Sequence, residues 1–138
     1  MRKFELEHRV AYVETDAMAI VHHSNYIRWF EMGRNDMLRT IGYPYSKLEK
    51  MGIWMPVIGV ACDYKSPAVF DEVVLIRTWV DKVKGASVYL AYEVVGKESG
   101  EVKVTGSSSH GVTDTDLRPL RLKKEFPDLY EKLVNAMK

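Results

Sequence analysis

Residues 25–41, NYIRWFEMGRNDMLRTI, repeat apolar side chains every three or four positions, with polar residues on the other faces. This period predicts an amphipathic helix over Asn25 to Ile41, about 26 Å long at roughly 1.5 Å per residue. Ser24 is placed to cap its N-terminus, and Gly42 and Pro44 are placed to end it. An apolar stripe of this length needs long strands to cover it.

Strand patterns lie on both sides of this helix. Phe4 to Tyr12 alternates apolar with charged residues, as a strand with one covered face does. After the helix, β-branched and aromatic residues predict four strands, Val57–Val69, Val73–Val83, Val88–Val95 and Val102–Val112, joined mostly by short turns. Short turns favour antiparallel neighbours, so the expected fold is α+β, with the helix buried against a mostly antiparallel sheet. Pro127 to Met137 predicts a C-terminal surface helix.

Length and composition restrict the class of protein. The chain has 138 residues, 46% of them apolar and 28% charged, which fits one globular domain over residues 1–138. A net charge of +1 gives no field that would favour nucleic acid. Cys62 is the single cysteine, which fits a reducing compartment, and no apolar run suggests a signal peptide or a transmembrane segment. We therefore expect a cytoplasmic protein.

The stretch TDAMAIVHHSNY, Thr15 to Tyr26, gathers an acid and two histidines just before the predicted helix. Asp16 has two interpretations. It is either a turn residue whose side chain binds its own backbone two residues on, or a carboxylate placed for chemistry. The amides at the start of the helix are unpaired and lie at the positive end of its dipole, so they suit a developing negative charge.

The arrangement of Arg9-Val10, Thr15-Asp16, Ala19 to His23 and Tyr26 resembles the active-site motif of the 4-hydroxybenzoyl-CoA thioesterase family of hotdog-fold enzymes. Looser similarity extends over roughly residues 4 to 115. The resemblance implies a hotdog fold, in which a curved five-stranded sheet wraps a long central helix. The chain departs from many relatives at Met18 and Ala19, where a glycine is common in the family.

The same resemblance implies the function and the site. It predicts hydrolysis of small or medium acyl-CoA thioesters, with Asp16 as nucleophile or general base and no cofactor beyond the CoA of the substrate. His23 is the second catalytic position, through its backbone amide more than its ring. Tyr26 is implied as a substrate-binding residue. Family sites usually form between subunits, and the sheet edges predicted here also need covering, so we expect a homodimer or homotetramer.

Basic residues near the pocket mouth are needed for the phosphates of CoA. Lys82 and Lys84, beside the turn leading to Ser87, are the candidates, together with Arg118, Arg121 and Lys123. Each of them is also consistent with ordinary solvated surface. No short spacing of His and Cys predicts a metal site, and GSSSHG, Gly106 to Gly111, lacks the strand-to-helix context of a nucleophilic serine.

Two other functions fit the same sequence. One is a hotdog hydratase or dehydratase, which acts on an enoyl or hydroxyacyl thioester and needs a His and an acid for proton transfer. The other is a non-catalytic acyl-thioester-binding or scaffold protein that keeps the fold for assembly. Loss of the substrate double bond would distinguish the first from hydrolysis, and substitution of Asp16 would distinguish the second.

Overall fold

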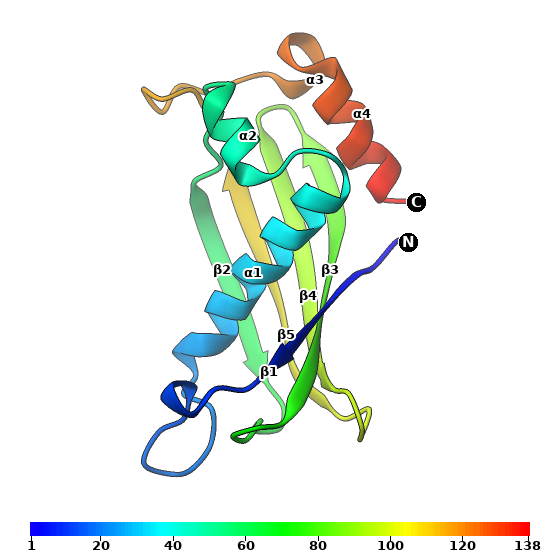
Figure 1. Cartoon of the computed structure of the whole chain (residues 1–138). Coiled ribbons are helices and arrows are strands. Elements are labelled where there is room, and N and C mark those ends of the chain that lie inside the picture. The colour runs from blue at the N-terminus through cyan, green and yellow to red at the C-terminus, as the bar shows by residue number, and fades with distance from the viewer.

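A computed structural model describes all residues, 1–138. Its strands are β1 (Phe4–Arg9), β2 (Val57–Tyr64), β3 (Val73–Lys84), β4 (Ser87–Gly96) and β5 (Val102–Gly111). Its helices are the short 3-10 turn η1 (Tyr12–Glu14), α1 (Ser24–Thr40), α2 (Tyr45–Lys50), α3 (Leu122–Glu125) and α4 (Pro127–Ala136). The long α1 lies diagonally across the curved sheet (Figure 1).

The sheet has the strand order β1-β3-β4-β5-β2, and every neighbouring pair is antiparallel. This confirms the predicted α+β hotdog architecture. One connection differs from the expected short turns, because β2 and β3 follow each other in sequence but lie at separate places in the sheet. Residues 65–72 therefore form a crossover from β2 to β3, at the end of the sheet where α1 begins (Figure 1).

Two glycines let α1 lie close to the sheet. A Cβ atom on Gly33 would come within 3.0 Å of Thr78 and Ile76 of β3, and one on Gly106 would come within 3.0 Å of the Phe30 ring. Phe30 stacks on Tyr92 of β4 with ring centroids 4.3 Å apart. The apolar stripe predicted from the sequence is therefore the face that α1 buries.

Three element ends differ from the sequence prediction. Ser24 is the first residue of α1 rather than its cap, and the Ser24 N–H donates to Nδ1 of His22 at 3.3 Å. The β1 strand ends at Arg9 because the chain turns into η1, and β2 ends at Tyr64 because the crossover begins there. The predicted extensions to Tyr12 and Val69 are therefore wrong.

Helices cover the far end of the sheet. The α2 helix, whose six residues follow Pro44 and bury Leu48, was not predicted from the sequence. The C-terminal α4 was predicted, and it packs against β3 through Leu129, Leu133 and Ala136. The Tyr43 hydroxyl donates to Asp128, which ties the end of α1 to α4.

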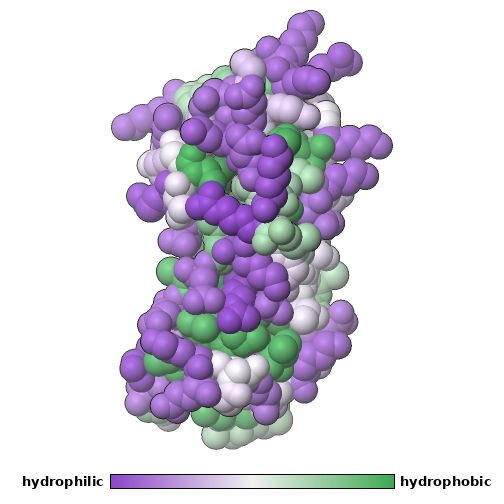
Figure 2. Space-filling model, turned by 90° about the vertical axis from the view of Figure 1, so that its right-hand side faces the viewer, coloured by the Kyte–Doolittle hydropathy of each residue, from purple (hydrophilic) through white to green (hydrophobic).

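The two edge strands present different surfaces. The side of β1 is largely hydrophilic, with separate apolar patches (Figure 2), and ion pairs such as Lys97 with Glu7 and Arg77 with Glu5 lie along it. The β2 strand instead exposes a row of apolar side chains: Val57, Ile58, Val60 and Tyr64. Charge protects a strand edge against pairing, so β2 is the edge left open to another chain.

Candidate active site

Asp16 lies in a tight loop between η1 and α1, at the lower end of the molecule in Figure 1. The Asp16 N–H donates to the carbonyl of Ile20 at 2.9 Å, and the Ala19 N–H donates to the carbonyl of Asp16 at 2.9 Å. Ala19 has a φ of 62°, a left-handed conformation that costs a non-glycine residue about 1–2 kcal/mol. The departure from glycine seen in the sequence therefore falls on a strained position of this loop.

The Asp16 carboxylate uses one of its two oxygens within the chain. Oδ1 accepts a hydrogen bond from the N–H of Met18 at 2.8 Å, which is the local turn contact expected for this residue. No hydrogen bond within the chain engages Oδ2. The turn interpretation and the chemical one are therefore compatible, because one oxygen orients the side chain and the other is left for a ligand.

The start of α1 faces the same space. The His23 N–H donates to no acceptor within the chain, and it lies at the positive end of the helix dipole. The His23 ring is exposed and lies 4.2 Å from the His22 ring, whose Nδ1 is engaged by Ser24. The backbone amide of His23 is thus free to meet an anionic oxygen.

A cavity of about 330 Å³ brings these groups together. It contains three of the predicted site residues, Asp16, His23 and Tyr26. Its other walls come from the Asp16 loop and from the crossover after β2, and they consist of Met18, Ile20, Val21, Tyr64, Lys65, Ser66 and Pro67. The wall formed by Tyr64 to Pro67 was not predicted, because these residues were expected to lie within the longer strand Val57–Val69.

Tyr26 contributes its ring to the cavity and its hydroxyl to the scaffold. The Ala68 N–H donates to the Tyr26 hydroxyl at 3.1 Å, and the side chain is 3% exposed. Burial raises the pKa of Tyr26. The phenol therefore stays neutral and anchors the crossover to α1.

Glu14, two residues before Asp16, fixes the start of the Asp16 loop through three hydrogen bonds. Its carboxylate accepts hydrogen bonds from the Ala11 N–H at 2.7 Å, from Trp29 Nε1 at 2.7 Å and from His8 Nε2 at 2.8 Å. Burial acts to raise the pKa of Glu14, but these hydrogen bonds outweigh it and the pKa is lowered. Glu14 was not predicted, since it follows the alternating segment and its partners His8 and Trp29 lie elsewhere in the sequence.

The residues predicted to bind CoA lie elsewhere in the chain. Lys82, Lys84 and Ser87 flank the β3–β4 turn, at the opposite end of β3 from the Asp16 loop (Figure 1). Arg121 and Lys123 lie close to this turn, because they line a hollow of about 610 Å³ together with Gly85 and Ala86 of the turn. Arg118 is exposed and does not line the hollow. One chain therefore does not bring the basic residues to the Asp16 cavity.

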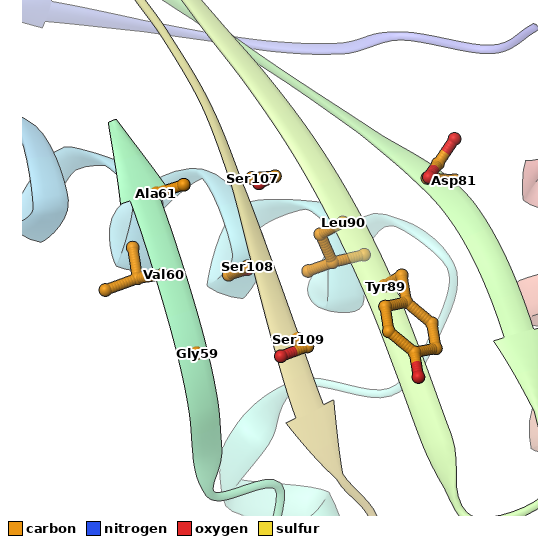
Figure 3. A pocket seen from close by; sticks show the side chains of 9 residues that line it. All are labelled: Gly59, Val60, Ala61, Asp81, Tyr89, Leu90, Ser107, Ser108 and Ser109. Carbon is orange, nitrogen blue, oxygen red and sulfur yellow. The ribbon is translucent and has the colours of Figure 1, made fainter. Parts of the chain in front are cut away.

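A further hollow of about 380 Å³ lies across β2, β5 and β4 (Figure 3). Small residues, among them Gly59, Ser107 and Ser109, form its floor, and Asp81 and Tyr89 lie at its side. Gly106 to Gly111 lies within β5, apart from any strand-to-helix turn. Ser108 itself bonds to the Tyr92 hydroxyl at 2.7 Å and to His110 Nε2 at 2.7 Å.

No three or more His, Cys, Asp or Glu residues gather where they could hold a metal ion. No helix is both long and apolar enough to cross a bilayer.

The long helix lying in a curved antiparallel sheet defines the chain as a hotdog-fold protein. The sequence profile described as Thioesterase-like superfamily matches residues 10–134. The chain therefore belongs to the thioesterase-like superfamily, and the resemblance seen in its sequence is confirmed.

Individual relatives agree with this membership. The chain is 34% identical over 137 residues to a putative acyl-CoA thioesterase, YneP, of Bacillus subtilis, covering 99% of this chain and 97% of the relative. It is 39% identical over 95 residues to a putative esterase of Aquifex aeolicus, covering 69% of this chain and 73% of the relative. A crystal structure of a DHNA-CoA thioesterase from Staphylococcus aureus is 34% identical, with a TM-score of 0.92, and covers 98% of this chain and 91% of the other.

Proposed function

We propose that this protein hydrolyses small or medium acyl-CoA thioesters to the free acid and CoA. The observation that carries the proposal is the cavity of about 330 Å³ that is lined both by Asp16 and by His23, the residue directly before α1. Membership of the thioesterase-like superfamily and the putative acyl-CoA thioesterase of Bacillus subtilis support the same chemistry. Hydrolysis consumes only water, so we include no cofactor, and the lone Cys62 fits a cytoplasmic setting.

In this proposal the thioester carbonyl lies between Asp16 and the start of α1. The His23 N–H donates to the carbonyl oxygen and stabilises the negative charge that develops there, an effect worth about 3–4 kcal/mol for a well-placed donor. The free oxygen of Asp16 either attacks the acyl carbon or takes a proton from the attacking water. In the first route the carbon–sulfur bond breaks as the CoA thiolate leaves, and water then hydrolyses the mixed anhydride on Asp16 to the free acid and supplies the proton of the thiol. In the second route the water oxygen adds to the acyl carbon, the carbon–sulfur bond breaks, and the proton taken up by Asp16 passes to the leaving CoA sulfur.

A second copy of the chain completes the site. Two β2 strands paired antiparallel about a two-fold axis would place the β3–β4 turn of one subunit toward the Asp16 end of the other. Ser87 lies on β4, two strand spacings from β2 at the shared edge, with β5 between them, which is about 10 Å at roughly 4.8 Å per spacing. Lys82, Lys84 and Ser87, with Arg121 and Lys123, are then placed to bind the phosphates of CoA in the partner's site.

Pairing of two subunits through β2 can be tested at Val60. Val60 lies near the middle of β2 and is exposed, so in a two-fold pairing its two copies face each other. Val60→Lys places like charges together, and we expect light scattering to show monomers and hydrolysis to fall with the dimer fraction. Leu117→Lys, at an exposed loop position, is the control and should stay dimeric. A Val60→Lys protein that remains dimeric would contradict pairing through β2.

A thiol-release screen tests the activity itself. We expect CoA to be released from short, medium or aromatic acyl-CoAs, and 1,4-dihydroxy-2-naphthoyl-CoA belongs in the panel because a relative from Synechococcus is named for its hydrolysis. An enoyl-CoA in the same panel is followed for loss of its double bond. Double-bond loss without thiol release would support the hydratase alternative, and neither signal with any thioester would support a scaffold.

A further inference from the structure

Lys103 on β5 is a buried lysine that the proposed chemistry does not use. It is 6% exposed, whereas lysine is almost never this buried unless it is paired. Its ammonium group lies 3.2 Å from Glu72 Oε2, 3.1 Å from Glu101 Oε1 and 3.3 Å from the carbonyl oxygen of Pro67. A lysine has three N–H donors, and all three have an acceptor here.

These contacts converge on the crossover that walls the cavity. The Lys103 carbonyl accepts hydrogen bonds from the N–H groups of Lys65 at 2.8 Å and Ser66 at 3.1 Å. The Ser66 hydroxyl donates to Glu101, and the Val69 N–H donates to Glu72 Oε1 at 3.1 Å. Every residue from 65 to 69 except Ala68 is therefore bonded either to Lys103 or to one of the two carboxylates that pair with Lys103, Glu72 and Glu101.

Ala68 provides the link to the catalytic side. Its N–H donates to the Tyr26 hydroxyl at 3.1 Å, and its carbonyl accepts from the Val21 N–H at 2.9 Å. Val21 in turn forms a bridge with Thr15, the neighbour of Asp16. Lys103 is thus connected to the Asp16 loop by its hydrogen bond to Pro67, by the peptide bond from Pro67 to Ala68, and by the hydrogen bond of Ala68 to Val21.

Burial acts to lower the pKa of Lys103, but its bonds to Glu101 and Glu72 outweigh it and the pKa is raised. The ammonium therefore keeps all three donors at physiological pH, as this arrangement requires.

We propose that Lys103 is a positioning residue of the acyl-CoA site, which fixes the crossover wall and, through Ala68, the loop that carries Asp16. The inference rests on the proposed thioesterase function. It assigns Lys103 no contact with the substrate. Its effect on catalysis comes from where Lys65, Ser66 and Pro67 are held against the cavity.

The test compares Lys103→Met, Lys103→Arg and the double variant Lys103→Met/Glu72→Gln by kcat, KM and thermal unfolding. Lys103→Met removes the ammonium contacts to Pro67, Glu72 and Glu101 but keeps the main-chain carbonyl that binds the crossover. We expect KM for the best acyl-CoA to rise about tenfold, the effect of one lost charged hydrogen bond. Lys103→Arg keeps the charge and should recover part of this loss. The double variant also removes the carboxylate left unpaired, so it should regain thermal stability while its KM stays high.

A double variant with restored thermal stability but a high KM would show that Lys103 positions the site rather than only stabilising the fold. Lys97→Met is the matched control, since Lys97 is an exposed lysine near the same end of the sheet that pairs with Glu7, and its KM should equal that of the wild type. A double variant with both stability and KM restored would overturn the inference, and so would a wild-type KM in folded Lys103→Met. A wild-type protein that releases no thiol would instead refute the proposed function, and the positioning role with it.

Discussion

Replacing Asp16 by Asn is expected to lower kcat for thioester hydrolysis by about a hundredfold to ten-thousandfold, the range over which a positioned acid–base group contributes. The reason is chemical rather than structural. Asn keeps an oxygen that can accept the hydrogen bond from the Met18 N–H, so the turn is preserved. It loses the negative charge that both proposed roles require, attack on the acyl carbon and activation of water. Thiol release from the best substrate of the screen measures the effect.

The control for this variant is Asp116→Asn, at an exposed position of the loop between β5 and α3. It changes the same charge away from the cavity and should leave turnover unchanged. Thermal unfolding and light scattering should be the same for both variants and the wild type. Full turnover in folded Asp16→Asn would refute the assignment, and Glu31, which lines a separate small cavity with Arg34, would be the next acid to substitute.

The second large effect is a loss of stability in mild acid caused by His110. Its side chain is 2% exposed, and burial, with the nearby positive charge of Arg34, lowers the pKa of His110 from 6.5 to about 4. Between pH 6.5 and pH 4 His110 is protonated in the unfolded chain but stays neutral in the folded chain. The contribution of His110 to the free energy of unfolding is therefore fully present above pH 6.5 and falls as the pH drops toward 4. We expect the free energy of unfolding to decrease by roughly 2 to 3 kcal/mol between pH 7 and pH 4.5.

Urea unfolding of the wild type and of His110→Gln over this range isolates the residue. Gln retains an acceptor for the Ser108 hydroxyl but does not titrate, so the variant should lose most of this slope even if its stability at pH 7 is lower. His22→Asn, at an exposed histidine, is the control and should keep the wild-type slope. The lowered pKa of Glu14 acts below pH 4.5 and so lies outside this range. An equal slope in His110→Gln would contradict the prediction.

Local patterns were sufficient to predict most of the fold. The helical period over Asn25 to Ile41 predicted α1 within one residue at each end, because a buried stripe on a long helix leaves a strong signal. The β3, β4 and β5 strands were predicted within one residue at each end, where glycine-containing turns or breaks bound them. Asp16, His23 and Tyr26 were predicted from the resemblance of one short stretch to a family motif, and the structure brings them to one cavity.

Features that depend on non-local pairing were not predicted. The position of β2 beside β5 follows from contacts between residues far apart in sequence, such as Val60 with Ser108, and no local pattern encodes it. The crossover was therefore taken as more strand, and its wall of the cavity was missed. Lys103 was missed for a related reason, because a lysine in an alternating strand is expected to face water unless its partners, Glu72 and Glu101, are known.

In a hairpin, the length of the loop affects the register of the two strands that it joins. The crossover between β2 and β3 differs, because these two strands are not neighbours in the sheet. Its residues bound the Asp16 cavity, yet β2 pairs with β5 and β3 pairs with β1 and β4, so the crossover joins two strands that do not pair with each other. Insertions or deletions here can widen or narrow the space for an acyl group while every strand pair stays in place. A change in this one stretch of chain can thus alter which thioester such a scaffold accepts while the sheet is kept, provided that the hydrogen bonds of Ala68 to Tyr26 and Val21 are retained.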